Sequence, residues 1–157
     1  MNTIELYRLF RLSSGVSIDS RTVSDNQLFF AIKGDNFDGN KFAQDALKKG
    51  ASFVVLDDPG AVTDRCILVG NTLQELQSLA SFYRNNLNAK VLAITGTNGK
   101  TTTKELITAV LSKKYKLHST KGNLNNQIGV PLTILSAPID TEILVVDYME
   151  HLAAHEL

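Results

Sequence analysis

A glycine loop between an apolar strand and a helix constrains the fold of this chain more than any other feature. Residues 95–102 read Thr-Gly-Thr-Asn-Gly-Lys-Thr-Thr and follow the apolar run 91–94. Glycines let the backbone turn tightly, so that successive amide groups and the start of the helix point at a phosphate. In such loops a lysine neutralises the negative charge of the phosphates, and a serine or threonine hydroxyl binds the magnesium ion. We therefore expect this loop to bind nucleotide phosphates through Gly96, Thr97, Asn98, Gly99, Lys100, Thr101 and Thr102.

The match is to the shorter ending G-x-x-G-K-T, because the longer phosphate-loop pattern would need glycine at Ile94. The plainer alternative is an ordinary glycine turn that joins a strand to a helix. Three consecutive threonines, 101–103, argue against that alternative, since threonine is a poor helix former and its hydroxyl suits a ligand. Strand, glycine loop and helix in this order predict a mostly parallel sheet that binds its ligand at the carboxyl end of the strand.

An acidic candidate follows the later apolar run 143–146. Asp147 ends this run, and a carboxylate at the tip of a strand beside a phosphate loop is the arrangement of a magnesium ligand. An apolar strand that ends on a solvated acid is the alternative. The segment 120–131 is rich in asparagine, whose amide group binds sugars, pyrophosphate and peptides, although the same residues are common in solvated loops.

The polar stretch 85–90 marks a boundary, which we place between residues 1–88 and 89–157. In the first part the pattern predicts short strands within 18–38, a helix capped by Asn40 that stops at Gly50, and strands at 52–56 and 66–69. A longer helix follows, with apolar residues at helical spacing from Leu73 to Leu87. The second part continues from the strand at 91–94, with an apolar helical stripe formed by Leu106, Ile107, Val110 and Leu111. Both parts belong to the α/β class.

Composition excludes several classes of function. The 16 basic and 16 acidic residues give a formal net charge of zero, so no overall field favours nucleic acid or anionic lipid. The single cysteine, Cys66, lies in an apolar run and is expected to be a buried, reduced thiol. No apolar run is long enough to span a membrane and no secretory signal is visible, so we expect a cytoplasmic protein.

Two motifs together resemble the Mur ligase family. They are Gly-Thr-Asn-Gly-Lys-Thr-Thr at 96–102 and Lys-Gly-Asn-Leu-Asn-Asn-Gln-Ile-Gly-Val-Pro-Leu-Thr at 121–133. The first occurs throughout the family, and the second points to the member that adds D-alanyl-D-alanine to a UDP-N-acetylmuramoyl tripeptide in peptidoglycan synthesis. In the first part, Ile-Asp-Ser-Arg at 18–21, residues 28–34 and residues 37–42 resemble the uridine-nucleotide domain of that family.

The resemblance implies a small mixed-sheet UDP-substrate domain, followed by the first part of a mostly parallel ATP-binding domain. It implies ATP and Mg²⁺ as cofactors, with Lys100 and Asp147 as catalytic residues and Thr101 and Asp147 as metal ligands. The substrates would be UDP-N-acetylmuramoyl-tripeptide and D-alanyl-D-alanine, which react through an acyl phosphate. The residues implied in substrate binding are Ser20, Arg21, Lys33, Gly34, Asn123, Asn125 and Asn126.

Two departures from the family pattern stand out. Where the family has Glu-Met-Gly-Ala-Asn-His, residues 147–151 read Asp-Tyr-Met-Glu-His, so either Asp147 or His151 could replace a metal ligand. The family also continues through a lid domain that closes over ATP, so we expect this length of chain to lack turnover by itself. Two alternatives remain: the ligase that adds meso-diaminopimelate or lysine, and a nucleotide-binding module without catalysis.

Overall fold

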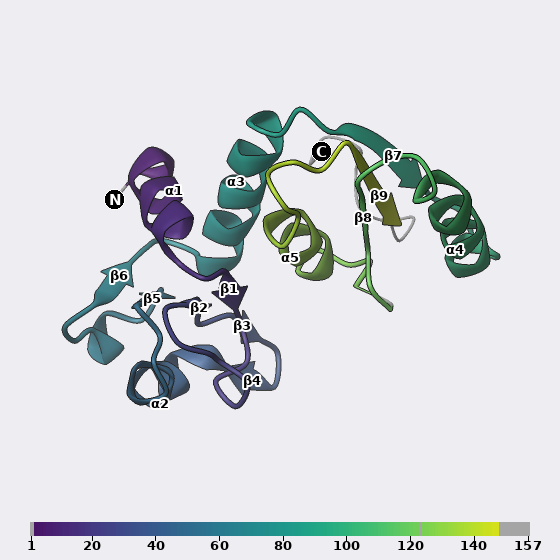
Figure 1. Cartoon of the computed structure of the whole chain (residues 1–157). Coiled ribbons are helices and arrows are strands. Elements are labelled where there is room, and N and C mark those ends of the chain that lie inside the picture. The colour runs from purple at the N-terminus through teal and green to yellow at the C-terminus, as the bar shows by residue number, and fades with distance from the viewer. Residues whose placement is uncertain (1, 123, 148–157) are drawn as a thin grey trace. The chain divides into compact units, whose positions relative to one another are not determined.

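The computed structural model describes residues 2–122 and 124–147 (Figure 1). Contacts within the chain form two compact units: Leu79 closes the first unit and Ala80 opens the second. The division falls inside helix α3, Thr72–Asn85. Each unit contains its own sheet of parallel strands, so the α/β class expected from the sequence is confirmed.

The first unit is built around a four-stranded parallel sheet. Its strands are β1 (Val16–Ser17), β2 (Leu28–Phe30), β5 (Phe53–Leu56) and β6 (Cys66–Leu68), in the order β1-β2-β5-β6. All three residues of β2 are fully buried, and so are Val54, Val55 and Leu56 of β5. A central parallel strand is covered on both faces, which explains why these strands read as continuous apolar runs rather than alternating ones.

Helix α1 (Thr3–Leu12) was not predicted from the sequence. Its start is a capping box, in which the side chain of Asn2 accepts from the Glu5 amide while the Glu5 side chain accepts from the Asn2 amide. Leu6 and Phe10, one turn apart, are the buried residues of this helix. The Asn-x-x-Glu spacing was the signal that could have revealed it.

The helix predicted from Asn40 begins differently. A 3₁₀ turn, η1 (Gly39–Phe42), comes first, and Asp38 rather than Asn40 caps it by accepting from the Asn40 amide. Helix α2 (Ala43–Lys48) follows and ends before Gly50, whose φ of +105° suits glycine. The capping role given to Asn40 was therefore wrong, because this side chain is buried and bonds to other partners.

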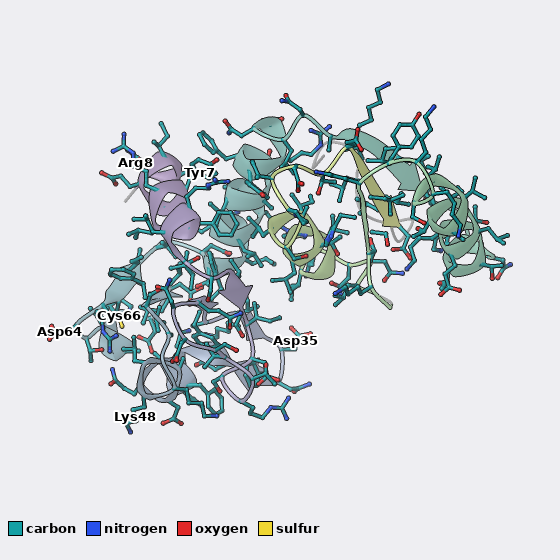
Figure 2. The ribbon with its side chains drawn as sticks, viewed as in Figure 1. Tyr7, Arg8, Asp35, Lys48, Asp64 and Cys66 are labelled. Carbon is teal, nitrogen blue, oxygen red and sulfur yellow. The ribbon has the colours of Figure 1, made fainter. Side chains whose placement is uncertain are left out.

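An antiparallel hairpin follows β2 within the segment 18–38, where short strands were predicted. Strands β3 (Lys33–Gly34) and β4 (Phe37–Asp38) pair in a separate two-stranded sheet, so parallel and antiparallel pairings are not mixed in one sheet. Asp35, at the turn of this hairpin, extends away from the ribbon in Figure 2. Farther along the chain, the short 3₁₀ turn η2 (Pro59–Ala61) precedes β6.

Cys66, also labelled in Figure 2, lies at the start of β6. It is a free thiol, as expected, but it is only half-buried rather than buried. Its strand lies at the edge of the sheet, and the Sγ atom lies 3.4 Å from Oγ1 of Thr63. The exposure of Cys66 therefore follows from the position of its strand at the edge of the sheet, which composition does not reveal.

The second unit contains a three-stranded parallel sheet. Its strands are β7 (Lys90–Ile94), β8 (Leu117–Ser119) and β9 (Ile143–Asp147), in the order β7-β9-β8. Helices α4 (Lys100–Leu111) and α5 (Gly129–Leu135) lie on opposite sides of this sheet (Figure 1). Because the strands are parallel, the segments that follow β7, β8 and β9 meet at one edge.

The apolar stripe predicted on α4 is present but largely uncovered in the described chain. Leu106 is 64% exposed and Val110 is 69% exposed. These two residues line an apolar hollow of about 400 Å³ with Leu92, Ile107 and Leu111. The buried residue of this helix is instead Lys104. Among the described residues, no helix combines the length and the apolar content needed to cross a bilayer.

Candidate functional site

The glycine loop joins β7 to α4 at the carboxyl edge of the second sheet. Gly96 has a φ of +138° and Gly99 a φ of +78°, values that side chains rarely adopt. The helix begins directly after Gly99, and this N-cap residue has no side chain with which to cap the first turn. Its first amide groups are therefore not engaged by a cap and are available to an anion.

The side chain of Lys100 folds back over this loop. Its ammonium donates to the carbonyl oxygen of Gly96 and is partly buried. Thr101 and Thr102 lie exposed on the first turn of α4. A phosphate oxygen is a stronger acceptor for an ammonium than a carbonyl oxygen is, so an arriving phosphate can take over the Lys100 interaction.

Asp147 lies at the end of the neighbouring strand and is fully buried. It pairs in register with Ile94, the last residue before the glycine loop. Its amide donates to Oγ1 of Thr120 at 3.4 Å, and both of its carboxylate oxygens are buried without a hydrogen bond among the described residues. The alternative of a solvated acid is therefore wrong.

A buried carboxylate whose oxygens accept no hydrogen bond from the described residues fits a magnesium site chemically, because Mg²⁺ prefers oxygen ligands. The described residues contain no cluster of three or more His, Cys, Asp or Glu side chains that could hold a metal. Mg²⁺ in nucleotide sites needs few protein ligands, since it keeps several waters and binds through one or two carboxylates and the phosphates. Asp147 and the Thr101 hydroxyl would be the ligands that the protein supplies to the ion.

Lys104 is the functional candidate that sequence reasoning missed. Its Nζ lies 3.7 Å from Oδ2 of Asp147 and donates to the carbonyl oxygen of Gly122 at 3.0 Å. The available signal was its position four residues after Lys100, which places both lysines on one face of α4. This residue connects α4, the end of β9 and the segment after β8.

The asparagine-rich segment follows β8 at the same edge. Oδ1 of Asn126 accepts from the amides of Ile128 and Gly129 at 3.1 and 2.8 Å, which organises the start of α5. Asn125 is half-buried. Asn123 and His151 lie outside the described residues. The side-chain oxygen of Asn126 is thus engaged structurally, whereas the side chain of Asn125 forms no hydrogen bond with another described residue.

In the first unit, the predicted substrate residues follow two neighbouring parallel strands. Ser20 and Arg21 come after β1, and Lys33 and Gly34 come after β2, so both pairs belong to the carboxyl edge of the sheet. Arg21 forms a two-pronged ion pair with Asp19, in which Nη2 lies 2.7 Å from Oδ2 and Nε lies 2.9 Å from Oδ1. The hydrogen bonds from Arg21 lower the pKa of Asp19 to about 2.

A polar cluster around the buried side chain of Asn40 lies at the same edge, since Asp57 directly follows β5. Nδ2 of Asn40 donates to Asp38 at 2.9 Å and to Asp57 at 3.0 Å, and Oδ1 of Asn40 accepts from the Asp57 amide at 3.2 Å. Asp57 also accepts from the Thr72 amide at the start of α3. Burial raises the pKa of Asp57, but the hydrogen bonds from Asn40 and Thr72 outweigh it, so the net shift is downward.

This cluster predicts a pH-dependent contribution to stability. The Asp57→Asn variant keeps the shape but replaces one acceptor oxygen with a donor, and we expect it to lose about 1 kcal/mol of unfolding free energy at pH 7. Because the folded pKa of Asp57 is lowered, its contribution is present above the unfolded value near 3.8 and is lost as the pH falls through the folded value. Urea unfolding of both proteins at pH 7 and pH 3 checks this. If the difference in unfolding free energy between the two proteins is larger at pH 3 than at pH 7, the prediction is contradicted.

Comparison with known proteins agrees with this geometry. Residues 13–94 match the profile described as Mur ligase family, catalytic domain, and residues 94–157 match the Mur ligase middle domain. The UDP-N-acetylmuramoyl-tripeptide–D-alanyl-D-alanine ligase of Bacillus subtilis is 45% identical over 136 residues, which cover 85% of this chain and 30% of that protein. The Escherichia coli ligase of the same name is 36% identical over 132 residues, covering 84% of this chain and 29% of its own length.

Solved structures show the same relationship. The Thermotoga maritima MurF ligase in complex with ADP is similar with a TM-score of 0.79 and 35% identity, covering 88% of this chain and 32% of that one. A D-alanyl-D-alanyl ligase from Acinetobacter baumannii gives a TM-score of 0.81 at 27% identity, covering 94% of this chain and 36% of its own. A 2,6-diaminopimelate ligase shares the fold at a TM-score of 0.55 and 19% identity, covering 87% of this chain and 31% of its own. The chain spans about 30% of the length of the curated relatives that it matches.

Proposed function

This chain belongs to the Mur ligase family of ATP-dependent amide ligases, and from that premise we propose that it forms the UDP-substrate and phosphate-binding parts of a ligase that joins D-alanyl-D-alanine to UDP-N-acetylmuramoyl-tripeptide. The observation that carries the proposal is the meeting of the glycine loop and Asp147 at one sheet edge. The 45% identity to a ligase of that name supports the choice within the family. A reaction that consumes ATP and a UDP-linked precursor belongs in the cytoplasm, where both are made.

The reaction requires two anions to approach each other. The terminal carboxylate of the tripeptide attacks the γ-phosphorus of ATP, the bond to the β-phosphate oxygen breaks, and ADP leaves. The amine of D-alanyl-D-alanine then attacks the resulting acyl phosphate, forms the amide, loses a proton and releases phosphate. Cations between the carboxylate and the γ-phosphate lower the barrier to the first step.

The residues of the second unit divide these tasks. The amides of the glycine loop and the Lys100 ammonium would hold the ATP phosphates, with Gly96, Gly99 and the start of α4 shaping the cradle. Magnesium, bound through Thr101 and Asp147, would neutralise phosphate charge and polarise the γ-phosphate. Asn123, Asn125 and Asn126 would face the muramoyl-peptide side of the substrate.

We place the UDP moiety on the first unit, at Ser20, Arg21, Lys33 and Gly34. The functional boundary proposed here lies between residues 88 and 89, in the link from the end of α3 to the start of β7. The competing assignment is the ligase that adds diaminopimelate or lysine. A solved structure of a 2,6-diaminopimelate ligase shares only the fold with this chain, at 19% identity. The two ligases differ in their nucleotide substrate, since the competitor takes a UDP-muramoyl dipeptide.

Titration with UDP-N-acetylmuramoyl-tripeptide should shift the backbone amide resonances of residues 18–21 and 33–40. The expected cause is contact between the uridine diphosphate and the carboxyl ends of β1 and β2. Nuclear magnetic resonance of the labelled chain measures these shifts, with the UDP-muramoyl dipeptide titrated in parallel. Shifts confined to residues 89–147 would contradict the proposed UDP site, and tighter binding of the dipeptide would favour the competing ligase.

A further inference from the structure

Lys104 and Asp147 form a buried pair of opposite charges beside the glycine loop. The Lys104 side chain is 4% exposed and the Asp147 side chain is 0% exposed, and the shortest distance between their charged atoms is 3.7 Å. Removing either charge from a site this dry would leave the other uncompensated, which is strongly unfavourable. In the absence of a ligand, each residue therefore neutralises the other.

The pair is compensated in charge but not in hydrogen bonding. The Lys104 ammonium donates to the Gly122 carbonyl oxygen at 3.0 Å rather than to the carboxylate. Neither carboxylate oxygen of Asp147 accepts a hydrogen bond from a described residue. Buried polar atoms are normally satisfied, so two open oxygens on one carboxylate indicate a position prepared for another ligand. That ligand must be cationic or a donor.

Lys104 changes which cations this carboxylate can attract. The Lys104–Asp147 pair as a whole carries no net charge, and its ammonium repels a divalent ion strongly in a medium of low dielectric constant. Nucleotide phosphates bring several negative charges to the adjacent loop. The net charge around Asp147 then becomes negative and attracts a divalent cation. Lys104 also lies one turn beyond Lys100, so both lysines act on the same edge of the sheet.

We propose that Lys104 is a positioning residue that makes magnesium binding at Asp147 depend on the nucleotide. The inference rests on the proposed role of Asp147 as a metal ligand. Without nucleotide, the Lys104 ammonium compensates the carboxylate and no divalent ion is held. With nucleotide, the metal enters together with the phosphates, and Lys104 keeps Gly122 and the end of β9 in place around it.

The test measures divalent-ion binding to the chain without nucleotide. Mn²⁺, which shares the oxygen preference of Mg²⁺, is titrated and followed by electron paramagnetic resonance. We expect the Lys104→Met variant to bind Mn²⁺ at least about tenfold more tightly than the unchanged chain. We also expect its lowered melting temperature to be restored by MgCl₂, but not by NaCl of equal ionic strength. Lys104→Arg keeps the charge and should behave like the unchanged chain in both assays.

The double variant Lys104→Met/Asp147→Asn is the matched control, because it removes both charges and should respond to neither Mn²⁺ nor Mg²⁺. No gain in Mn²⁺ affinity in Lys104→Met, or an equal gain in the double variant, would overturn the proposal. Lys104→Gln, which can still donate to Gly122, is examined if Lys104→Met does not fold. Failure of both to fold in saturating Mg²⁺, while the double variant folds, would equally overturn it. ADP binding is measured separately, because it depends on Lys100 rather than on Lys104. If the unchanged chain does not bind ADP, the proposed function is refuted, whatever the Mn²⁺ results show.

Discussion

Replacing Lys100 with alanine should weaken ADP binding by at least tenfold. The ammonium of Lys100 reaches across the loop to Gly96, where a phosphate would compete with a neutral carbonyl oxygen for it. A hydrogen bond to a charged group contributes about 1.5–3 kcal/mol, and about 1.4 kcal/mol corresponds to a factor of ten in affinity. Isothermal titration calorimetry with ADP and MgCl₂ measures the change directly.

Lys113→Ala is the matched control for this prediction. Lys113 is exposed just beyond the end of α4, so the variant removes the same kind of charge at the opposite end of the helix from the loop. Its ADP affinity should stay within about twofold of the unchanged chain, because exposed charges are screened by salt. Equal affinities in Lys100→Ala and Lys113→Ala would mean that the loop is only a turn.

Replacing Gly129 with alanine should lower the unfolding free energy by about 2–3 kcal/mol. A Cβ atom at this position would lie 2.5 Å from the carbonyl carbon of Leu124 and 2.6 Å from its Cα and oxygen atoms. These are backbone atoms, which cannot rotate away as a flexible side chain would. The first turn of α5 and the segment after β8 would have to separate, and urea unfolding followed by circular dichroism measures the cost.

Gly70→Ala is the comparison for Gly129→Ala. No atom lies within 4 Å of a Cβ placed at Gly70, and its φ is not in the left-handed region. The substitution should change stability by no more than about 0.5–1 kcal/mol, and in the stabilising direction, because it restricts the unfolded chain. Similar losses from the two substitutions would show that the contact between Gly129 and Leu124 does not explain the requirement for glycine.

Local patterns in the sequence were enough to predict the elements that form the candidate site. A strand at 91–94, the glycine loop and the helix from Lys100 were all predicted, as was the strand that ends on Asp147, and the first strand begins one residue earlier in the structure. These features depend on properties of adjacent residues, such as apolar runs and glycine spacing. The short strand β8 and helix α5 were missed, since Leu117–Ser119 is not an apolar run and seven residues are too few to establish a helical period.

The sequence by itself therefore determined the α/β class, the glycine loop between strand and helix, and the candidate residues on each strand end. Only the tertiary structure decided that Asp147 is buried beside Lys104, that Asn40 bridges Asp38 and Asp57, and that Leu106 and Val110 face outward. Periodicity shows which side chains share a face, but not what packs against that face. Burial and charge compensation arise between residues that are distant along the chain, so they exist only once the strands and helices have been brought together.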